Sequence, residues 1–246
     1  MERLGRHFQL IDTMSNQNRY TRQMMMPEFG EEGQRRLAEA RVLIVGAGGL
    51  GSPIALYLAG AGIGNIGLID GDAVSVHNLQ RQILYTEKEI GQKKVHCAQK
   101  RLEAFNSDVK IDIYNEFLSG KNANDIIGKY DIIVDGSDNF ATRYLINDTC
   151  LALHKVYVYG SVSGFRGQAA VFNLNGSPIN YRTLFPEEEE IIASENCEGI
   201  IGAVPGVVGC TMAMEVIKIV CGIGTPLDGK LWTYNFLTNE QHIFEI

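Results

Sequence analysis

The fold is decided by Val42-Leu43-Ile44-Val45-Gly46-Ala47-Gly48-Gly49-Leu50-Gly51, where branched aliphatic residues lead directly into a glycine-rich turn. The continuous apolar run over 42–45 predicts a strand that is buried on both faces of a parallel sheet. Glycines at the spacing G-x-G-x-x-G allow a tight turn and let backbone amides approach a phosphate at a helix N-terminus. Residues 50–62 are small and apolar and predict that helix. The stretch therefore indicates a nucleotide-binding α/β protein.

A second strand follows the helix, over Ile66 to Ile69, and the three elements together form one βαβ unit. Asp70 ends this strand and lies nineteen positions beyond Gly51. A carboxylate at that place is positioned to bind a ribose hydroxyl. Taken alone, the glycines and Asp70 are typical of a nicotinamide or flavin cofactor site.

Strand and helix patterns continue to alternate along the chain. Pro27 separates two short helical segments, and after Gly164 the pattern changes to a strand, a long irregular loop, an apolar helix and a hairpin. We expect an α/β fold with a doubly wound, mostly parallel Rossmann-like sheet and antiparallel C-terminal strands. The expected helices cover residues 92–105, 139–154 and 207–220, the expected strands cover 109–114, 131–134, 156–159, 168–174, 230–236 and 241–246, and the acidic run 187–190 is expected to be a solvated loop.

The composition limits the class of protein. With 246 residues and 45% hydrophobic content, we expect a single domain over residues 18–246, preceded by a flexible arm over residues 1–17. The net charge of -7 gives no general attraction to nucleic acid or to anionic membranes. The N-terminal residues have neither the apolar core of a signal peptide nor the length of a membrane span. Five cysteines without a C-x-x-C pair are interpreted as reduced thiols, so a cytoplasmic protein is expected.

A group of cationic and amide side chains downstream of Asp70 favours a nucleotide whose phosphates are cleaved. Asp70-Gly71-Asp72 is followed by Asn78-Leu79-Gln80-Arg81-Gln82 and then by Gly91-Gln92-Lys93-Lys94. A dinucleotide cofactor keeps its pyrophosphate intact and needs few cations. Cleavage of a triphosphate needs several donors to neutralise charge on the leaving pyrophosphate and on the attacked phosphate. Arg81 and Lys94 supply such donors.

A third polar group, Asp135-Gly136-Ser137-Asp138-Asn139, follows directly after a predicted buried strand. The carboxyl ends of parallel strands form the edge where ligands bind in this architecture. Asp138 could there hold a magnesium ion that bridges phosphate oxygens. The alternative is that Ser137 and Asp138 cap the N-terminus of the following helix, for which both residue types are common choices.

Together these motifs resemble the ThiF/MoeB/HesA family of sulfur-carrier adenylyltransferases, which are related to the ubiquitin-activating enzymes. The resemblance covers the chain from Asn18 onward and implies one adenylation domain. It begins with Arg19-Tyr20-Thr21-Arg22-Gln23, continues through the glycine-rich turn and the polar groups described above, and extends to Gly202-x-x-Pro205-Gly206. Because several spaced motifs occur in one order, the resemblance is specific.

The resemblance implies a set of site residues. The nucleotide-binding residues would be Gly46, Gly48, Gly49, Gly51, Asp70, Asp72, Asn78, Arg81, Gln82 and Lys94, with Asp70 on the ribose and Asn78, Arg81 and Lys94 on the phosphates. Catalysis would rest on Arg81, Lys94, Asp138 and Arg22, and Asp138 would bind Mg2+. In the family Arg22 reaches across a homodimer into the active site of the partner. The alternative for Arg22 is an ordinary exposed charge on a helix.

The chain departs from the family pattern at one place and is ambiguous at another. Many members hold a structural zinc ion with two C-x-x-C pairs, but this sequence has Asn180-Tyr181-Arg182-Thr183 at the first position and no pair near Ile246. The ligands of a tetrahedral zinc site are missing there, so we expect a zinc-free member. Cys197 lies where some members form a covalent bond with the carrier protein, and a plain loop cysteine is an equal alternative.

The reaction that the resemblance implies is an adenylation that uses ATP and Mg2+. Its substrate would be the C-terminal glycine carboxylate of a small ubiquitin-like sulfur carrier of the thiamine or molybdopterin type, ending in Gly-Gly, and pyrophosphate would be released. Three alternatives are a tRNA-modifying ATP-dependent dehydratase of the same superfamily, an NAD-dependent oxidoreductase and a catalytically silent nucleotide-binding partner. The acidic composition disfavours tRNA, and the retained Arg81, Lys94 and Asp138 disfavour the other two.

Overall fold

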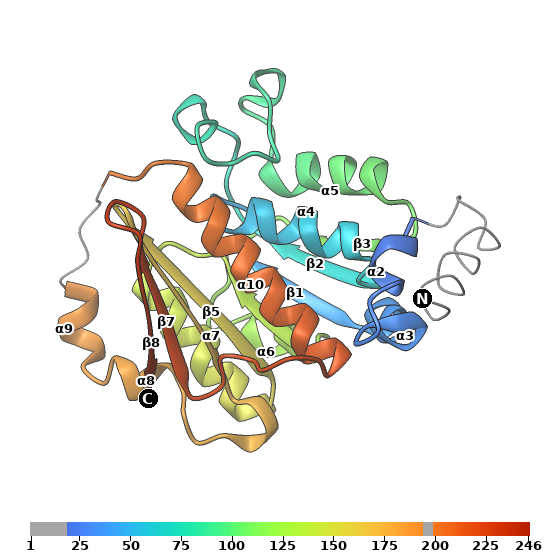
Figure 1. Cartoon of the computed structure of the whole chain (residues 1–246). Coiled ribbons are helices and arrows are strands. Elements are labelled where there is room, and N and C mark those ends of the chain that lie inside the picture. The colour runs from blue at the N-terminus through green and yellow to red at the C-terminus, as the bar shows by residue number, and fades with distance from the viewer. Residues whose placement is uncertain (1–18, 194–198) are drawn as a thin grey trace.

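The computed structural model describes residues 19–193 and 199–246. Within these residues, eight strands form one sheet that has helices packed on both faces (Figure 1). The strands are β1 (Arg41–Val45), β2 (Asn65–Ile69), β3 (Lys110–Tyr114), β4 (Ile132–Asp135), β5 (Val156–Ser163), β6 (Arg166–Phe172), β7 (Lys230–Asn235) and β8 (Glu240–Glu245). Their order across the sheet is β3-β2-β1-β4-β5-β6-β7-β8.

The sheet is parallel over its first five strands and antiparallel over its last three. β1 pairs in parallel with β2 on one side and with β4 on the other, and β4 pairs in parallel with β5. β6, β7 and β8 each run antiparallel to the strand before them. The predicted fold is therefore confirmed. The chain order reverses between β1 and β4, and a crevice at such a point is where ligands bind in this class of fold.

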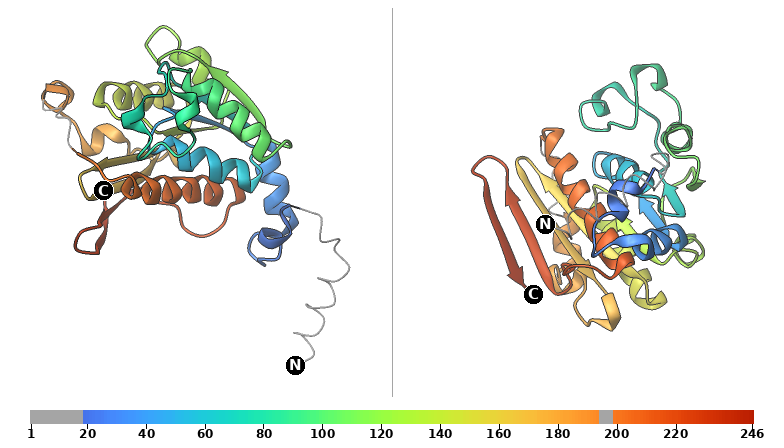
Figure 2. Two further views of the ribbon diagram at one scale, coloured as in Figure 1. Left: turned by 90° about the horizontal axis from the view of Figure 1, so that it is seen from above. Right: turned by 45° about the vertical axis from the view of Figure 1, so that its right-hand side comes forward.

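The helices form two layers, one on each face of the sheet. α4, α5 and α10 cover one face and α6 and α7 cover the other (Figures 1 and 2). The helices are α2 (Thr21–Met24), α3 (Gly30–Glu39), α4 (Gly51–Ala61), α5 (Lys94–Phe105), α6 (Ala123–Ile127), α7 (Phe140–Leu153), α8 (Tyr181–Leu184), α9 (Glu188–Ala193) and α10 (Ala203–Cys221).

The side chains of β1 alternate between the two layers. Val42 and Ile44 belong to the apolar cluster under α4 and α10, whereas Leu43 and Val45 belong to the cluster on the side of α7. All four residues are buried. Two covered faces therefore explain why this strand has a continuous apolar sequence instead of an alternating one.

Two local predictions were wrong. The acidic run 187–190 is not a loop, because α9 begins at Glu188, and glutamates in a first turn are favourable at the positive end of a helix. The apolar helix predicted from residue 207 begins four residues earlier, at Ala203. Pro205 lies in its first turn, where a missing backbone N–H removes no helical hydrogen bond.

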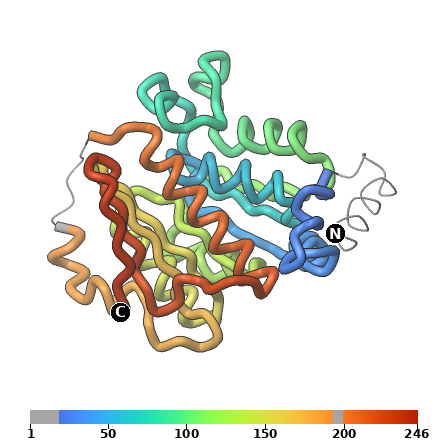
Figure 3. The backbone as a smooth tube through the Cα atoms, in the orientation of Figure 1, coloured from blue at the N-terminus to red at the C-terminus, as the bar shows by residue number. Residues whose placement is uncertain are grey.

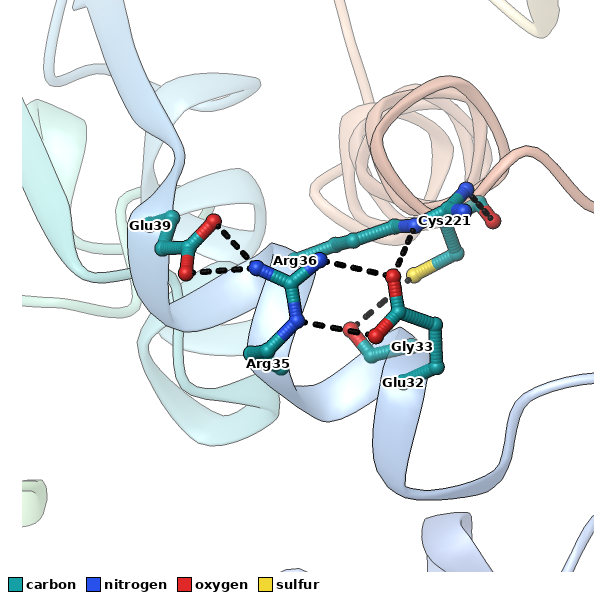
Figure 4. A network of polar contacts seen from close by, with 6 residues as sticks. All are labelled: Glu32, Gly33, Arg35, Arg36, Glu39 and Cys221. Carbon is teal, nitrogen blue, oxygen red and sulfur yellow. Dashed lines mark hydrogen bonds and ion pairs between the residues drawn. The ribbon is translucent and has the colours of Figure 1, made fainter.

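The C-terminal end of α10 is anchored to α3 by a polar network (Figure 4). Arg36 Nη1 donates to the Cys221 carbonyl oxygen at 2.9 Å, and Arg36 Nε donates to Glu32 at 2.9 Å. Cys221 Sγ lies 3.6 Å from the Gly33 carbonyl oxygen. The last carbonyls of a helix have no partner within the helix, so this arginine satisfies one of them.

α10 is also the only helix in the described ranges that is long and apolar enough to cross a membrane, with a mean hydropathy of 1.7 over its most apolar window. Half of that window is buried in the structure. Val208, Met212 and Val216 are fully buried in the cluster that includes residues of β1, β5 and β6. These contacts are those of a core helix in an α/β protein.

The segment between β2 and α5 projects from the body of the molecule (Figure 3). It contains two single turns of 3-10 helix, Val76–Asn78 and Glu87–Glu89. Backbone hydrogen bonds from Gly91 N to Val74 O and from Lys94 N to Asp72 O close it at its base. The base of this segment is therefore held next to the ends of the strands.

Candidate nucleotide-binding site

A cavity of about 700 Å3 opens at the carboxyl ends of β1, β2, β4 and β5. Segments that are far apart in the sequence meet here because parallel strands all end at this edge of the sheet. The sequence-predicted residues that line the cavity are Gly46, Gly48, Gly49, Asp70, Asp72, Arg81, Gln82, Lys94 and Asp138.

The glycines of the turn have two different roles. Gly46 has a φ of +90°, and a side chain at Gly51 would lie 2.0 Å from the Gly46 carbonyl oxygen. At Gly48 and Gly49, by contrast, an added Cβ would meet its nearest neighbours, which are side-chain atoms, at 3.4 Å. Gly46 and Gly51 therefore close the turn on itself, while Gly48 and Gly49 leave room on the side of the cavity. Gly51 is not among the lining residues.

Asp70 holds the glycine-rich turn in place. Its Oδ2 accepts from the Ala47 backbone N–H at 2.9 Å, and its Oδ1 accepts from the Asp72 backbone N–H at 2.8 Å. Lys94 Nζ donates to Asp72 Oδ2 at 2.9 Å and lies 3.8 Å from Asp70 Oδ2. Lys94 is only 4% exposed, so its charge is paired inside the wall of the cavity.

Arg81 and Gln82 approach the glycines from the projecting segment. The Cγ and Cδ atoms of Arg81 lie beside Gly49, and its Nη1 donates to the His77 carbonyl oxygen at 3.2 Å. The Nε2 of Gln82 lies beside Gly48. Gln82 Oε1 is buried and has no hydrogen-bond partner among the described residues. It is therefore available to accept from a bound molecule or from water.

Four of the helices that the structure describes begin at the cavity, and their N-termini carry partial positive charge. Lys94, which lines the cavity, is the first residue of α5. Leu50 precedes α4, Asn139 precedes α7, and Pro205 lies in the first turn of α10. All three residues line the cavity. These helix ends and the guanidinium of Arg81 favour an anionic ligand in the part of the cavity that they line.

The carboxylate of Asp138 does not cap α7, which corrects the predicted Ser137/Asp138 cap. The cap is Asn139, whose Oδ1 accepts from the Thr142 backbone N–H at 2.9 Å. Asp138 is exposed and lines the cavity, and its carboxylate makes no hydrogen bond or ion pair with any residue that the structure describes. The capping alternative for Asp138 is thereby removed.

A buried carboxyl group below Asp138 fixes this turn. Asp135 is fully buried and accepts from Ser137 N at 2.9 Å, from Ser137 Oγ at 2.6 Å and from Tyr157 Oη at 2.6 Å. Burial raises the pKa of the Asp135 carboxyl, and the positive charge of Arg143, together with the hydrogen-bond donors, opposes that rise. Sequence reasoning included Asp135 in a motif but assigned it no role.

Sequence reasoning also missed residues on two walls of the cavity. Arg143, in the first turn of α7, and Phe117, in the loop after β3, both line it. Arg143 could have been suspected from its place five residues after Asp138 at the start of a helix. The sequence around Phe117 gives no such signal, because Phe117 and Gly71 come together only in the folded structure.

A second cavity, of about 470 Å3, adjoins the first over the antiparallel strands. Both cavities are lined by Ser161, Val162 and Ser163 of β5. The second continues over residues of β6, β7 and β8. The two cavities together offer space for a ligand much longer than a nucleotide.

Two further predicted residues, Asn78 and Arg22, lie elsewhere in the structure. Asn78 is buried in the projecting segment and does not line the cavity. Arg22 is exposed on α2, whose neighbouring Gln23 donates to the carbonyl of Ala61 at the end of α4 remote from the glycine-rich turn. Cys197 lies outside the described residues, as does the arm expected over residues 1–17.

Comparison with known sequences identifies the fold family. The ThiF family model matches residues 20–246. The chain belongs to the ThiF family. It is 46% identical over 230 residues to the adenylyltransferase and sulfurtransferase MOCS3-1 of Zea mays, covering 93% of this chain and 49% of that protein. It is also 46% identical to the sulfur carrier protein adenylyltransferase of Thermus thermophilus, covering 92% of this chain and 85% of that protein.

Solved structures agree with this ThiF-family fold. E. coli MccB crystallised with SeMet MccA has a TM-score of 0.83 and 24% identity, covering 94% of this chain and 72% of that chain. The structure of SeMet PaaA has a TM-score of 0.79 and 23% identity, covering 93% and 72%. The ThiF-family chain spans about half the length of the maize and Arabidopsis thaliana relatives that it matches.

Proposed function

We propose that this chain uses ATP to adenylate the C-terminal glycine carboxylate of a small ubiquitin-like sulfur-carrier protein and releases pyrophosphate. The proposal is carried by the convergence of the glycine-rich turn, Arg81, Lys94 and Asp138 on one cavity, where the Asp138 carboxylate has no partner among the described residues. It is supported by the names of two relatives, the sulfur carrier protein adenylyltransferase of Thermus thermophilus and the probable molybdopterin-synthase adenylyltransferase of Porphyra purpurea, which is 42% identical. E. coli MccB, at 25% identity and a TM-score of 0.80, was crystallised with ATP.

The nucleotide is proposed to lie with its phosphates on the glycine-rich turn. Gly48 and Gly49 leave space there, and the N-terminus of α4 directs backbone N–H groups toward it. Both oxygens of Asp70 already accept backbone hydrogen bonds. A ribose hydroxyl would therefore bind to a carboxylate that is already oriented, since each carboxylate oxygen accepts more than one hydrogen bond.

Asp138 fits the role of a magnesium ligand. Its carboxylate is exposed to the cavity and unpaired among the described residues, and Mg2+ prefers oxygen ligands. The described residues contain no group of three or more acidic, histidine or cysteine side chains that could hold a metal. A magnesium ion would therefore take one carboxylate from the protein and its other ligands from phosphates and water, and when bound it would neutralise phosphate charge.

The proposed reaction needs no general base, because the carboxylate of the carrier is already ionised at neutral pH. One carboxylate oxygen attacks the α-phosphorus of ATP, the bond to the β-phosphate oxygen breaks, and pyrophosphate leaves with that electron pair. The chain contributes orientation and charge stabilisation through Arg81 and Lys94. The product is an acyl-adenylate.

The decisive experiment incubates the protein with ATP, Mg2+ and a ubiquitin-like sulfur carrier ending in Gly-Gly, followed by intact-mass analysis of the carrier. We expect the mass of one adenylyl group on the carrier, and none on a carrier that lacks the final glycine. ATP turnover that depends on tRNA instead would support the dehydratase, and reduction of NAD would support the oxidoreductase. Binding of ATP without any product would support the silent partner.

We also propose that two copies pair through the outer face of α4 and α10. α4 contains no charged residue, and the two charged residues of α10, Glu215 and Lys218, pair with each other. Tyr57 of α4 and Met214 of α10 are exposed on this face, at 59% and 46%. Covering an uncharged outer helix face with a second copy of the chain is favourable, because apolar surface is removed from water. Because Arg22 lies far from the cavity of its own chain, pairing is the route by which it would reach an active site.

Mixing two inactive variants tests this arrangement. We expect Arg22→Ala and Arg81→Ala each to be inactive alone, and the mixture to recover roughly a quarter of wild-type adenylation after subunit exchange, because a mixed dimer contains one complete site. The measurement is carrier adenylation before and after exchange under mild denaturant. A mixture that stays as inactive as its components would exclude a role for Arg22 across the interface.

A further inference from the structure

Arg143 is a buried cation in the wall of the cavity, and the reaction described above does not use it. It is 5% exposed, lies in the first turn of α7 and lines the cavity. A guanidinium has five N–H donors. The only acceptor that the structure describes for them is the Ser137 carbonyl oxygen, 3.5 Å from Nη2, and the buried Nε has no partner among the described residues. The donors of this side chain are therefore largely unused.

No carboxylate of the described residues lies within ion-pair distance of Arg143. Asp135, whose charge acts on Arg143, accepts instead from Ser137 and Tyr157. The guanidinium carbon lies 5.1 Å from the ring centroid of Phe140 and 5.9 Å from that of Tyr159. Aromatic faces favour a cation but do not replace an anionic partner in a site of low dielectric constant. An anionic ligand in the cavity would supply a hydrogen-bonded partner for the Arg143 guanidinium.

The position of Arg143 indicates which anion it meets. The glycine-rich turn follows β1 and Asp70 follows β2, whereas Arg143 belongs to the helix after β4, next to β5. Ser161, Val162 and Ser163 of β5 line both cavities. A chain that extends from the second cavity over β5 therefore enters the first cavity on the side of Arg143. Its terminal group arrives between Arg143 and the glycine-rich turn.

We propose that Arg143 binds the terminal carboxylate of the acyl substrate and orients it toward the nucleotide. The inference rests on the proposed adenylation. The carboxylate oxygen that remains on Arg143 becomes the carbonyl oxygen of the acyl-adenylate. The other oxygen forms the bond to the α-phosphorus as pyrophosphate leaves, and no proton is transferred. A planar guanidinium suits this task because two parallel N–H donors match the geometry of a carboxylate.

The test compares two forms of one ligand in binding experiments without turnover. The probe is a ubiquitin-like sulfur carrier ending in Gly-Gly, prepared as the free acid and as the C-terminal carboxamide, and titrated by calorimetry in the presence of an α,β-methylene analogue of ATP. Wild-type protein is expected to bind the acid at least about ten-fold more tightly than the amide. Arg143→Met should bind both forms equally, and Arg143→Lys should keep a preference of about three-fold, because an ammonium lacks the planar fork.

Arg166→Met is the matched control. This exposed arginine lines only the second cavity, so its loss should leave the preference for the acid unchanged.

If Arg143→Met does not fold, Arg143→Lys and the two ligand forms on wild-type protein decide the question. If Arg143→Met still bound the acid more tightly than the amide, the proposal would be overturned. The proposal would also be overturned if Arg143→Met lost affinity for the ATP analogue measured without the carrier. Equal binding of acid and amide by the wild type would overturn it while leaving adenylation intact, whereas failure to bind either form would contradict the proposed function itself.

Discussion

Replacing Arg81 with alanine is expected to slow carrier-dependent exchange of pyrophosphate into ATP about 100- to 1000-fold. Arg81 lines the cavity beside Gly49, and its only described hydrogen bond is to the carbonyl of His77 in its own segment. Its charge is therefore available to the phosphates. Negative charge grows on the leaving pyrophosphate in the transition state, so the loss should affect the rate more than the affinity for ATP.

Lys93→Ala is the matched control for this measurement. Lys93 is exposed on the same segment, its Nζ donates to the Gly71 carbonyl oxygen at 2.8 Å, and it does not line the cavity. Removing it deletes one positive charge without touching the phosphates, so exchange should stay within about two-fold of the wild type. Unchanged exchange in Arg81→Ala, or an equal loss in Lys93→Ala, would show that Arg81 has no specific role.

Replacing Gly51 with alanine is expected to lower the free energy of unfolding by about 3 kcal/mol, which corresponds to a fall in Tm of roughly 6 to 12 °C for a chain of this size. The new Cβ would lie 2.0 Å from the Gly46 carbonyl oxygen, which is a backbone atom and cannot rotate away. The turn would have to open, and with it the contact between Ala47 N and Asp70. Thermal or urea unfolding measures this effect.

Gly48→Ala separates the two roles of the glycines. At Gly48 the nearest atom to a new Cβ is Gln82 Nε2, 3.4 Å away on a flexible side chain, so stability should change little. The methyl group would instead take space on the phosphate side of the turn and weaken ATP binding about ten-fold. If Gly48→Ala were the less stable variant and bound ATP normally, our division of these glycines would be wrong.

The helix cap at the site shows where local sequence is insufficient. Asp138 and Asn139 are adjacent and both are good capping residues, and the cap predicted from the sequence is the Ser137/Asp138 pair. In the structure Asn139 has the extended backbone (φ -132°, ψ 147°) from which a side chain reaches Thr142 N. The choice depends on the backbone conformation that the chain adopts between β4 and α7. In that conformation Asp138 lines the cavity.

Arg143 shows a second limit. Nothing in the run Phe140-Ala141-Thr142-Arg143 distinguishes a surface arginine from a buried one. Its burial depends on the ring of Tyr159, which β5 contributes, and on the Ser137 carbonyl, which Asp135 and Tyr157 hold in place. These contacts join segments that are separated in the sequence, so local sequence patterns do not predict them.

The sequence by itself determined the βαβ unit around residues 42–70, the parallel sheet and the set of polar motifs at its edge. It could do so because a strand buried on both faces and a glycine turn leave short-range patterns in the chain. Only the tertiary structure decided which glycines face the ligand space, which residue caps α7 and which cations are already paired, as Lys94 is with Asp72. These properties depend on distances between atoms of different segments, and those distances exist only after the sheet and its two helical layers have packed.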